Sequence, residues 1–121
     1  MTDREFIVAF EQGTLEEFKH ADHIRMAWIY LTTTDPEEAF ERIVCGIQHF
    51  AAVKNATTLY HETITLFWIC TVFAAIRRRT YKTFDQFLSA NEPLTRKDHL
   101  FEYYSREVVF SDRARRAWVS P

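Results

Sequence analysis

Residues 59–76 read LYHETITLFWICTVFAAI, and this stretch decides the fold class. From Ile64 onward, apolar side chains point in nearly every direction around a helix, so we expect a central helix that is packed on several sides. The apolar run 64–76 is shorter than the roughly 20 residues that a membrane-spanning helix needs, so we expect no membrane span. The helix opens with His61 and Glu62 side by side, and this polar start of a buried helix is the main question that the sequence raises.

Helical patterning continues over the rest of the chain. Asp35 before Pro36 predicts the start of a long helix, Thr14 with Glu17 has the form of a capping box, and Thr83 can cap a short helix. We expect helices over residues 20–33, 35–55, 57–79, 83–88 and 95–107, and a last turn or two after residue 111. The sequence therefore predicts an all-α fold, a compact bundle of five to six helices in a single domain 1–121, with 1–13 as a loosely ordered N-terminal segment.

Composition is that of an ordinary soluble protein, with 47% hydrophobic and 26% charged residues. Residues 1–60 hold 5 Lys and Arg against 10 Asp and Glu, a net charge of −5, whereas residues 61–121 hold 10 against 7, a net charge of +3. Residues 1–6 are polar and acidic rather than a long apolar stretch, so we expect no signal peptide. Cys45 and Cys70 are expected to be free, buried thiols in a reducing cytoplasm. The only basic run is 77–79, which complements a helix C-terminus, so we expect no nucleic-acid partner.

Two histidines lie on or beside the buried face of the predicted helix 20–33. A turn of about 100° per residue places His20 on the apolar stripe and His23 at its edge. They are three residues apart, close enough to share one ligand. The same reasoning places His49 on the solvent side of the next helix, so His49 is expected to be exposed and drops out of the site.

Connectivity brings these histidines towards the start of the central helix. Helices joined by short loops pack antiparallel to their neighbours, so in a simple up-down bundle His20, His23, His61 and Glu62 lie at the same end. Imidazole and carboxylate groups suit a divalent transition metal such as Fe, Zn, Cu or Ni. We therefore predict a metal site formed by these four residues, with His61 and Glu62 as the catalytic pair.

Other interpretations of the same residues remain open. Each histidine can be a satisfied core or capping group, and Glu62 is favourable near any helix N-terminus. A metal-free acid–base enzyme or small-molecule binder can use His61 and Glu62 alone. A third possibility is a non-enzymatic helical adaptor protein that docks a partner through its surface.

An aromatic-rich composition makes a pocket beside this cluster plausible. We expect its walls to include Tyr60, Thr65, Trp28 and Trp68, and the substrate to be a small organic molecule. His99 is a reserve ligand on a helix whose position the pattern does not fix. A homodimer is possible, but no interface can be read from the sequence.

Several stretches resemble a group of small bacterial proteins to which no activity is assigned. They are 18–31, with the pattern FxHxxHxxxAWxYL, 60–65, which reads YHETIT, and 104–119. The resemblance implies that these segments belong to one domain of a bacterial type of protein. It implies no activity, so no residue role follows from it.

Overall fold

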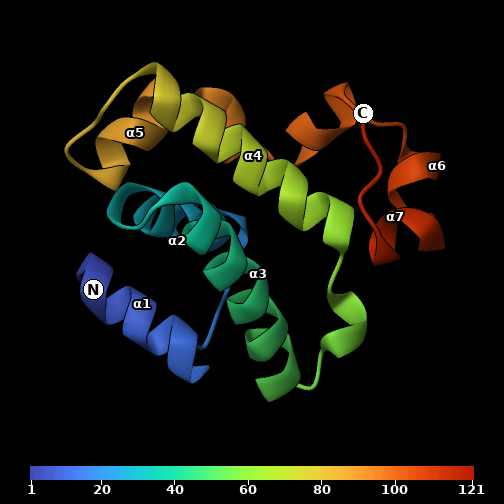
Figure 1. The fold of residues 1–121 in the computed structure, drawn as a ribbon, viewed down its shortest axis with the longest axis horizontal. Helices are drawn as coiled ribbons and strands as arrows, with labels where there is room; N and C mark the ends of the chain where they lie inside the picture. Colours follow the sequence, from blue (N-terminus) through green and yellow to red (C-terminus); the bar gives the residue numbers. More distant parts are fainter. The chain divides into compact units, whose positions relative to one another are not determined.

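The computed structural model describes all 121 residues as seven α-helices and three short 3-10 helices, without a strand (Figure 1). This confirms the predicted all-α fold. Residues 108–110, whose sequence VVF is typical of a strand, form the end of a helical turn and its C-cap. None of the helices combines the length and the apolar character that crossing a membrane requires.

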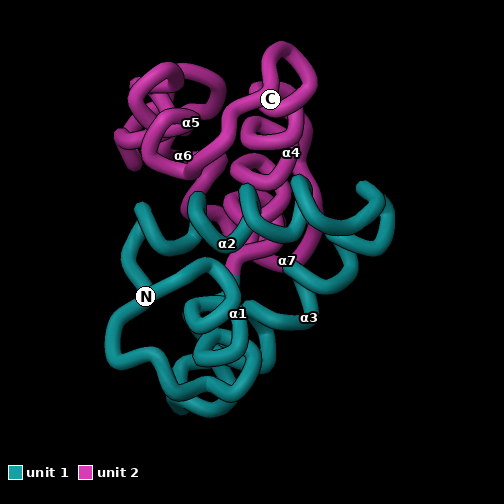
Figure 2. Tube along the Cα trace, turned by 90° about the vertical axis from the view of Figure 1, so that its left-hand side faces the viewer, with its two compact units in different colours: residues 1–60 teal, residues 61–121 magenta.

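The chain divides into two compact units, Met1–Tyr60 and His61–Pro121 (Figure 2). The first holds α1 (Asp3–Gln12), α2 (His20–Thr33), α3 (Pro36–Val53) and the 3-10 helix η1 (Thr57–Leu59). The second holds α4 (Glu62–Arg78), α5 (Phe84–Ala90), η2 (Glu92–Thr95), η3 (Lys97–Glu102), α6 (Arg106–Val109) and α7 (Asp112–Arg116). The single domain expected over 1–121 stays a prediction, and each unit is described by itself.

The expectation of a loosely ordered segment 1–13 is wrong, because these residues form α1. Thr2 accepts a hydrogen bond from the Glu5 N–H, and the Glu5 carboxylate accepts one from the Thr2 N–H, which makes a complete capping box. Gly13 ends the helix in the left-handed region, with φ of 71°. Thr14 does not cap a following helix as predicted, because its N–H and hydroxyl both donate to the Ala9 carbonyl at the end of α1.

An aromatic cluster around Phe10 forms the core of the first unit. The fully buried Phe10 ring lies 5.1 Å from Phe18, 5.9 Å from Phe50 and 6.4 Å from Tyr30, measured between ring centroids. These contacts join α1, α2 and α3, which all pack on one another. The predicted helices 20–33 and 35–55 are therefore confirmed, and Asp35 caps α3 as expected.

The second unit is organised along α4, with α5 beside one end and α6 and α7 beside the other (Figure 1). The helix predicted over 57–79 is interrupted. Residues 57–59 form η1, the chain is extended at Tyr60 and His61, and α4 begins at Glu62 with His61 as its N-cap. His61 is therefore the cap of the buried helix rather than a member of one of its faces.

Serine caps break the helix that was predicted over 95–107. The segment forms η3 and then α6, whose N-cap Ser105 accepts a hydrogen bond from the Val108 N–H. Ser111 caps α7 in the same way and also donates to the Val108 carbonyl. The predicted short helix after Thr83 is confirmed, and it runs two residues further than expected, to Ala90.

The close approach of α3 to the Phe10 ring predicts that Gly46→Ala destabilises the protein. A Cβ at position 46 would lie 2.6 Å from a ring carbon of Phe10, which its aromatic neighbours hold in place. Overpacking costs about 1–3 kcal/mol, whereas the gain in helix propensity is only about 1 kcal/mol. We expect a lower free energy of unfolding in urea. In a Phe10→Leu background the same change should become neutral or stabilising, and a more stable single variant would contradict the packing.

A buried tyrosine in the first unit predicts a specific loss of stability at alkaline pH. The Tyr30 hydroxyl donates to the Glu11 carboxylate at 2.5 Å, and burial together with this bond raises the pKa of Tyr30. Its contribution to stability is complete below the unfolded pKa of about 10 and is lost as pH rises towards the folded value. Tyr30→Phe should therefore be less stable than wild type at pH 8 by about 1–3 kcal/mol and should lose less stability above pH 10. The exposed Tyr103→Phe is the control, and parallel pH profiles for wild type and Tyr30→Phe would refute the prediction.

Candidate functional site

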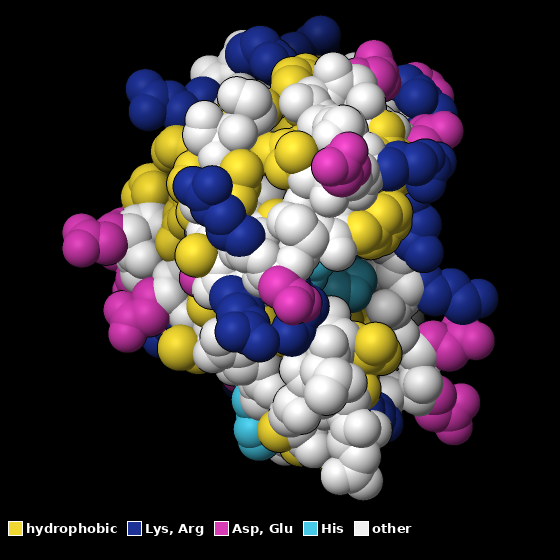
Figure 3. Space-filling model, turned by 90° about the vertical axis from the view of Figure 1, so that its right-hand side faces the viewer, with side chains coloured by type: hydrophobic (Ala, Val, Ile, Leu, Met, Phe, Trp, Pro, Cys, Tyr) yellow, Lys and Arg dark blue, Asp and Glu magenta, His cyan; other side chains and the backbone are white.

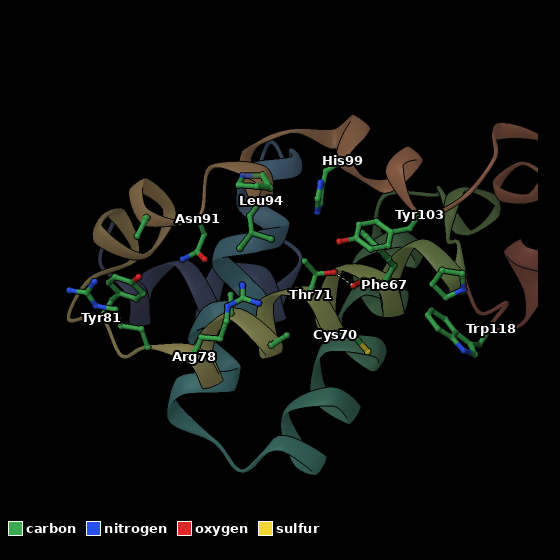
Figure 4. A pocket seen from close by; sticks show the side chains of 16 residues that line it. Phe67, Cys70, Thr71, Arg78, Tyr81, Asn91, Leu94, His99, Tyr103 and Trp118 are labelled. Carbon is green, nitrogen blue, oxygen red and sulfur yellow. Dashed lines mark hydrogen bonds between the residues drawn. The ribbon is translucent and has the colours of Figure 1, made fainter.

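The second unit contains a pocket of about 770 Å³, within the size range of small-molecule sites (Figure 4). All of its walls come from residues 61–121. Its lining residues are Phe67, Cys70, Thr71, Ala74, Ala75, Arg78, Arg79, Tyr81, Ala90, Asn91, Pro93, Leu94, His99, Tyr103, Trp118 and Pro121.

Three segments form most of the walls, and Arg79 and Tyr81 after α4 and Ala90 at the end of α5 complete them. One face of α4 supplies the residues from Phe67 to Arg78, and η2 and η3 with their flanking residues supply those from Asn91 to Tyr103. The third wall is the extended segment 117–121, which places Trp118 beside the pocket (Figure 4). Aromatic and aliphatic side chains predominate, so the pocket suits a ligand with an apolar body.

Two side chains fix the position of the segment 117–121. The hydroxyl of the fully buried Thr63 donates to the Ala117 carbonyl at 2.8 Å and accepts from the Val119 N–H at 3.0 Å. The Tyr104 hydroxyl donates to the Val119 carbonyl at 2.6 Å, and burial raises the pKa of Tyr104, so the donor stays protonated well beyond neutral pH. The wall that carries Trp118 is therefore held by hydrogen bonds from α4 and from Tyr104, which follows η3.

His99 is the buried titratable group of the pocket, with 8% of its surface exposed. Its Nδ1 lies 2.7 Å from the Glu102 carboxylate, and the Phe67, Trp68 and Tyr103 rings surround it at centroid distances of 5.3–6.4 Å. A carboxylate only accepts, so Nδ1 carries a proton, and in the neutral form of the ring Nε2 keeps its lone pair. No hydrogen bond occupies Nε2, and the protein has no sealed, unpartnered polar side-chain atom, so Nε2 is accessible. Figure 4 shows the ring pointing from η3 into the pocket.

Positive charge gathers at one end of the pocket. Arg78 and Arg79 line it where α4 ends, and no Asp or Glu lines it. Arg79 lies over the Tyr81 ring at 5.3 Å, whereas Arg78 has neither an ion pair nor a ring contact. The outer surface has a different distribution of charge from the pocket lining, because basic and acidic side chains are interspersed on the face that Figure 3 shows.

Both ring nitrogens of His61 are engaged within the second unit. Nδ1 accepts a hydrogen bond from the Ile64 N–H at 3.1 Å, so Nε2 carries the proton and donates to the Val109 carbonyl at 2.6 Å. This ring caps α4 and ties it to α6. Metal binding or general-base catalysis by His61 would require one of these bonds to be given up.

The other members of the predicted metal site lie in both units. His20 and His23 are half-buried residues of α2, with the His23 ring stacked on Phe18 at 3.9 Å, and Glu62 is the first residue of α4. Neither unit holds three or more His, Cys, Asp or Glu side chains grouped so that they could bind a metal. The metal site and the role of Glu62 stay predictions, which metal analysis of the purified protein would test.

The predicted pocket residues do not line the pocket of the second unit. Trp28 is buried in α2 and Tyr60 belongs to the first unit, while Thr65 and Trp68 lie on other faces of α4. Trp68 nevertheless supports the site, because it packs against the rings of His99 and Phe67.

Two further expectations concern exposure. His49 is exposed, as predicted. The expectation of buried thiols is wrong, because Cys45 and Cys70 are both exposed. Cys70 lines the pocket, where partial desolvation still raises the pKa of its thiol.

The sequence analysis missed the pocket because much of it comes from short helices without a clear apolar period. Residues 91–103 form two 3-10 helices, in which the 3.6-residue rule that assigns faces does not hold. One signal was available, since His99 and Glu102 are three residues apart and therefore adjacent on any helical turn.

Comparisons of this chain with protein-family models, with curated protein sequences and with solved structures give no match. The function is therefore argued from the geometry of the site.

The two hydrogen bonds of Thr63 predict that Thr63→Val loosens the wall of the pocket. Valine keeps the shape but leaves the Ala117 carbonyl and the Val119 N–H without their partner, which costs about 1–3 kcal/mol. We expect faster amide hydrogen exchange at residue 119 and a change in Trp118 fluorescence. Thr65→Val on the same helix is the control, and unchanged exchange in the Thr63 variant would refute the role of its hydroxyl.

Proposed function

We propose that this protein binds a small organic molecule in the pocket of its second unit and that His99 transfers a proton to or from that molecule. The proposal belongs to the metal-free acid–base class that the sequence left open, with His99 and Glu102 in the place of His61 and Glu62. The observation that carries it is a buried imidazole whose Nδ1 is held by a carboxylate and whose Nε2 is available in an aromatic pocket.

Each part of the pair has a distinct task. Nε2 of His99 takes a proton from the bound molecule or from a water beside it, and returns the proton later in the reaction. Glu102 holds the ring in the required tautomer and stabilises the imidazolium that forms. Arg96, 3.7 Å from the same Glu102 oxygen, keeps this carboxylate in place.

The aromatic surroundings support this assignment. Rings of Phe67, Trp68 and Tyr103 restrict the orientation of the imidazole, which is what a general base needs in order to meet its substrate in a fixed geometry. Figure 4 also shows the Tyr103 side chain reaching into the pocket, where its hydroxyl can donate to a bound molecule.

The test uses 5-nitrobenzisoxazole, from which a general base removes the proton on the ring carbon beside nitrogen while the N–O bond breaks and a coloured cyanonitrophenolate forms. We expect His99→Gln to lose the rate that His99 supplies, about 100-fold at the lower end of general-base catalysis, while Glu102→Gln loses part of it. The control is His49→Gln, which removes an exposed imidazole of the first unit. A folded His99→Gln variant with the wild-type rate, or an equal loss in the His49 variant, would contradict the role of His99.

A further inference from the structure

We infer that the ligand of this pocket is an aromatic or other apolar carboxylate, whose charged group binds to Arg78 while its body extends towards His99. The inference rests on the small-molecule pocket proposed above and adds the chemical class of the molecule.

The charge of the lining is the first argument. Arg78 and Arg79 line the pocket, and no acidic residue lines it to neutralise them. Glu92 and Glu102 flank lining residues, and both are already engaged: Glu92 pairs with Arg96, and Glu102 accepts from His99 and lies near Arg96. Arg78 and Arg79 are exposed, so water solvates their charge when the pocket is empty. A carboxylate would add a charge-assisted hydrogen bond to this site, which a neutral or cationic ligand cannot do.

The state of Arg78 is the second argument. Arg25, Arg42 and Arg96 form ion pairs, and Arg106 lies over the Phe101 ring at 4.2 Å. Arg78 has no such partner, and Figure 4 shows its side chain reaching into the pocket. A guanidinium group matches a carboxylate with two parallel hydrogen bonds.

The end of α4 offers another role for these arginines, because cations are favourable near a helix C-terminus. The helix dipole is equivalent to only about half an elementary charge, so it does not neutralise two guanidinium groups. Arg77, in the same last turn, also serves the dipole, and it lies over the Phe73 ring at 5.6 Å outside the pocket. Arg77 is therefore a matched control for Arg78.

The apolar body of the ligand follows from the middle of the pocket. Phe67, Ala74 and Leu94 are among the apolar residues that line the pocket, and Figure 4 shows Arg78 and His99 approaching it from opposite sides. A carboxylate at Arg78 would therefore place an apolar body against these side chains and direct its far end towards His99. No glycine lines the pocket, so it lacks the glycine-rich loop that is typical of phosphate sites. Of the two anionic groups, phosphate and carboxylate, we therefore infer a carboxylate.

The test compares 2-naphthoate with 2-naphthamide, which has nearly the same shape but no charge. Binding is measured by titration calorimetry, and its location by the protection of Cys70 from N-ethylmaleimide, with Cys45 in the first unit as the unprotected reference thiol. We expect naphthoate to bind wild type at least about tenfold more tightly than naphthamide, as one charge-assisted contact allows. Arg78→Gln should abolish this difference, and Arg77→Gln should preserve it.

The outcomes separate the two proposals. Equal affinities of wild type for both probes, with Cys70 protected, would overturn the carboxylate inference and leave the pocket proposal standing. Failure of both probes to protect Cys70 would overturn the pocket proposal and this inference with it. If Arg78→Gln does not fold, the salt dependence of binding to wild type is measured instead. Added NaCl should weaken the binding of naphthoate and leave the binding of naphthamide unchanged. An equal effect of salt on the two affinities would overturn the inference.

Discussion

The second unit depends on one buried hydroxyl. Thr63 donates to the backbone of residue 117 and accepts from that of residue 119, so a single oxygen joins the first turn of α4 to a segment more than fifty positions later. His61 makes a parallel connection to Val109 two residues earlier. Since a buried polar group without a partner is costly, the polar start of this helix is stable only when the later segments are in place. The pocket wall that carries Trp118 is a consequence of this constraint.

Long helices could be predicted from the sequence, and their interruptions could not. The apolar periodicity and the Asp35–Pro36 signal located α2 and α3, because burial of a stripe and proline at a first turn are local properties. The break before α4 depends on His61 acting as a cap, a role in which Ser, Thr, Asp and Asn are the usual residues. At the start of the chain the capping box of Thr2 and Glu5 was readable, yet only two of the residues of α1 are buried, so its apolar pattern is weak.

The site was less predictable than the fold, for a physical reason. The apolar periodicity of the sequence assigns a residue to one face of a helix, but it does not identify the segment that packs against that face. The partners of His61 include a carbonyl 48 positions away, and the rings around His99 come from α4 and from the end of η3. The distribution of charge in the sequence agrees better with the site. Residues 61–121 have an excess of Lys and Arg, and their pocket is lined by Arg78 and Arg79 without an Asp or Glu. The local pair of His99 and Glu102 could be predicted from the sequence, whereas the pocket beside His99 could not.

The bonds that hold the segment 117–121 all end on its backbone. Thr63 and Tyr104 contact the carbonyl and amide groups of residues 117 and 119, so the path of this segment does not depend on which side chains it carries. Trp118 stands between these anchor points and lines the pocket. Substitutions at position 118 can therefore reshape the pocket, while the backbone of the segment 117–121 and the pair of His99 and Glu102 keep their geometry.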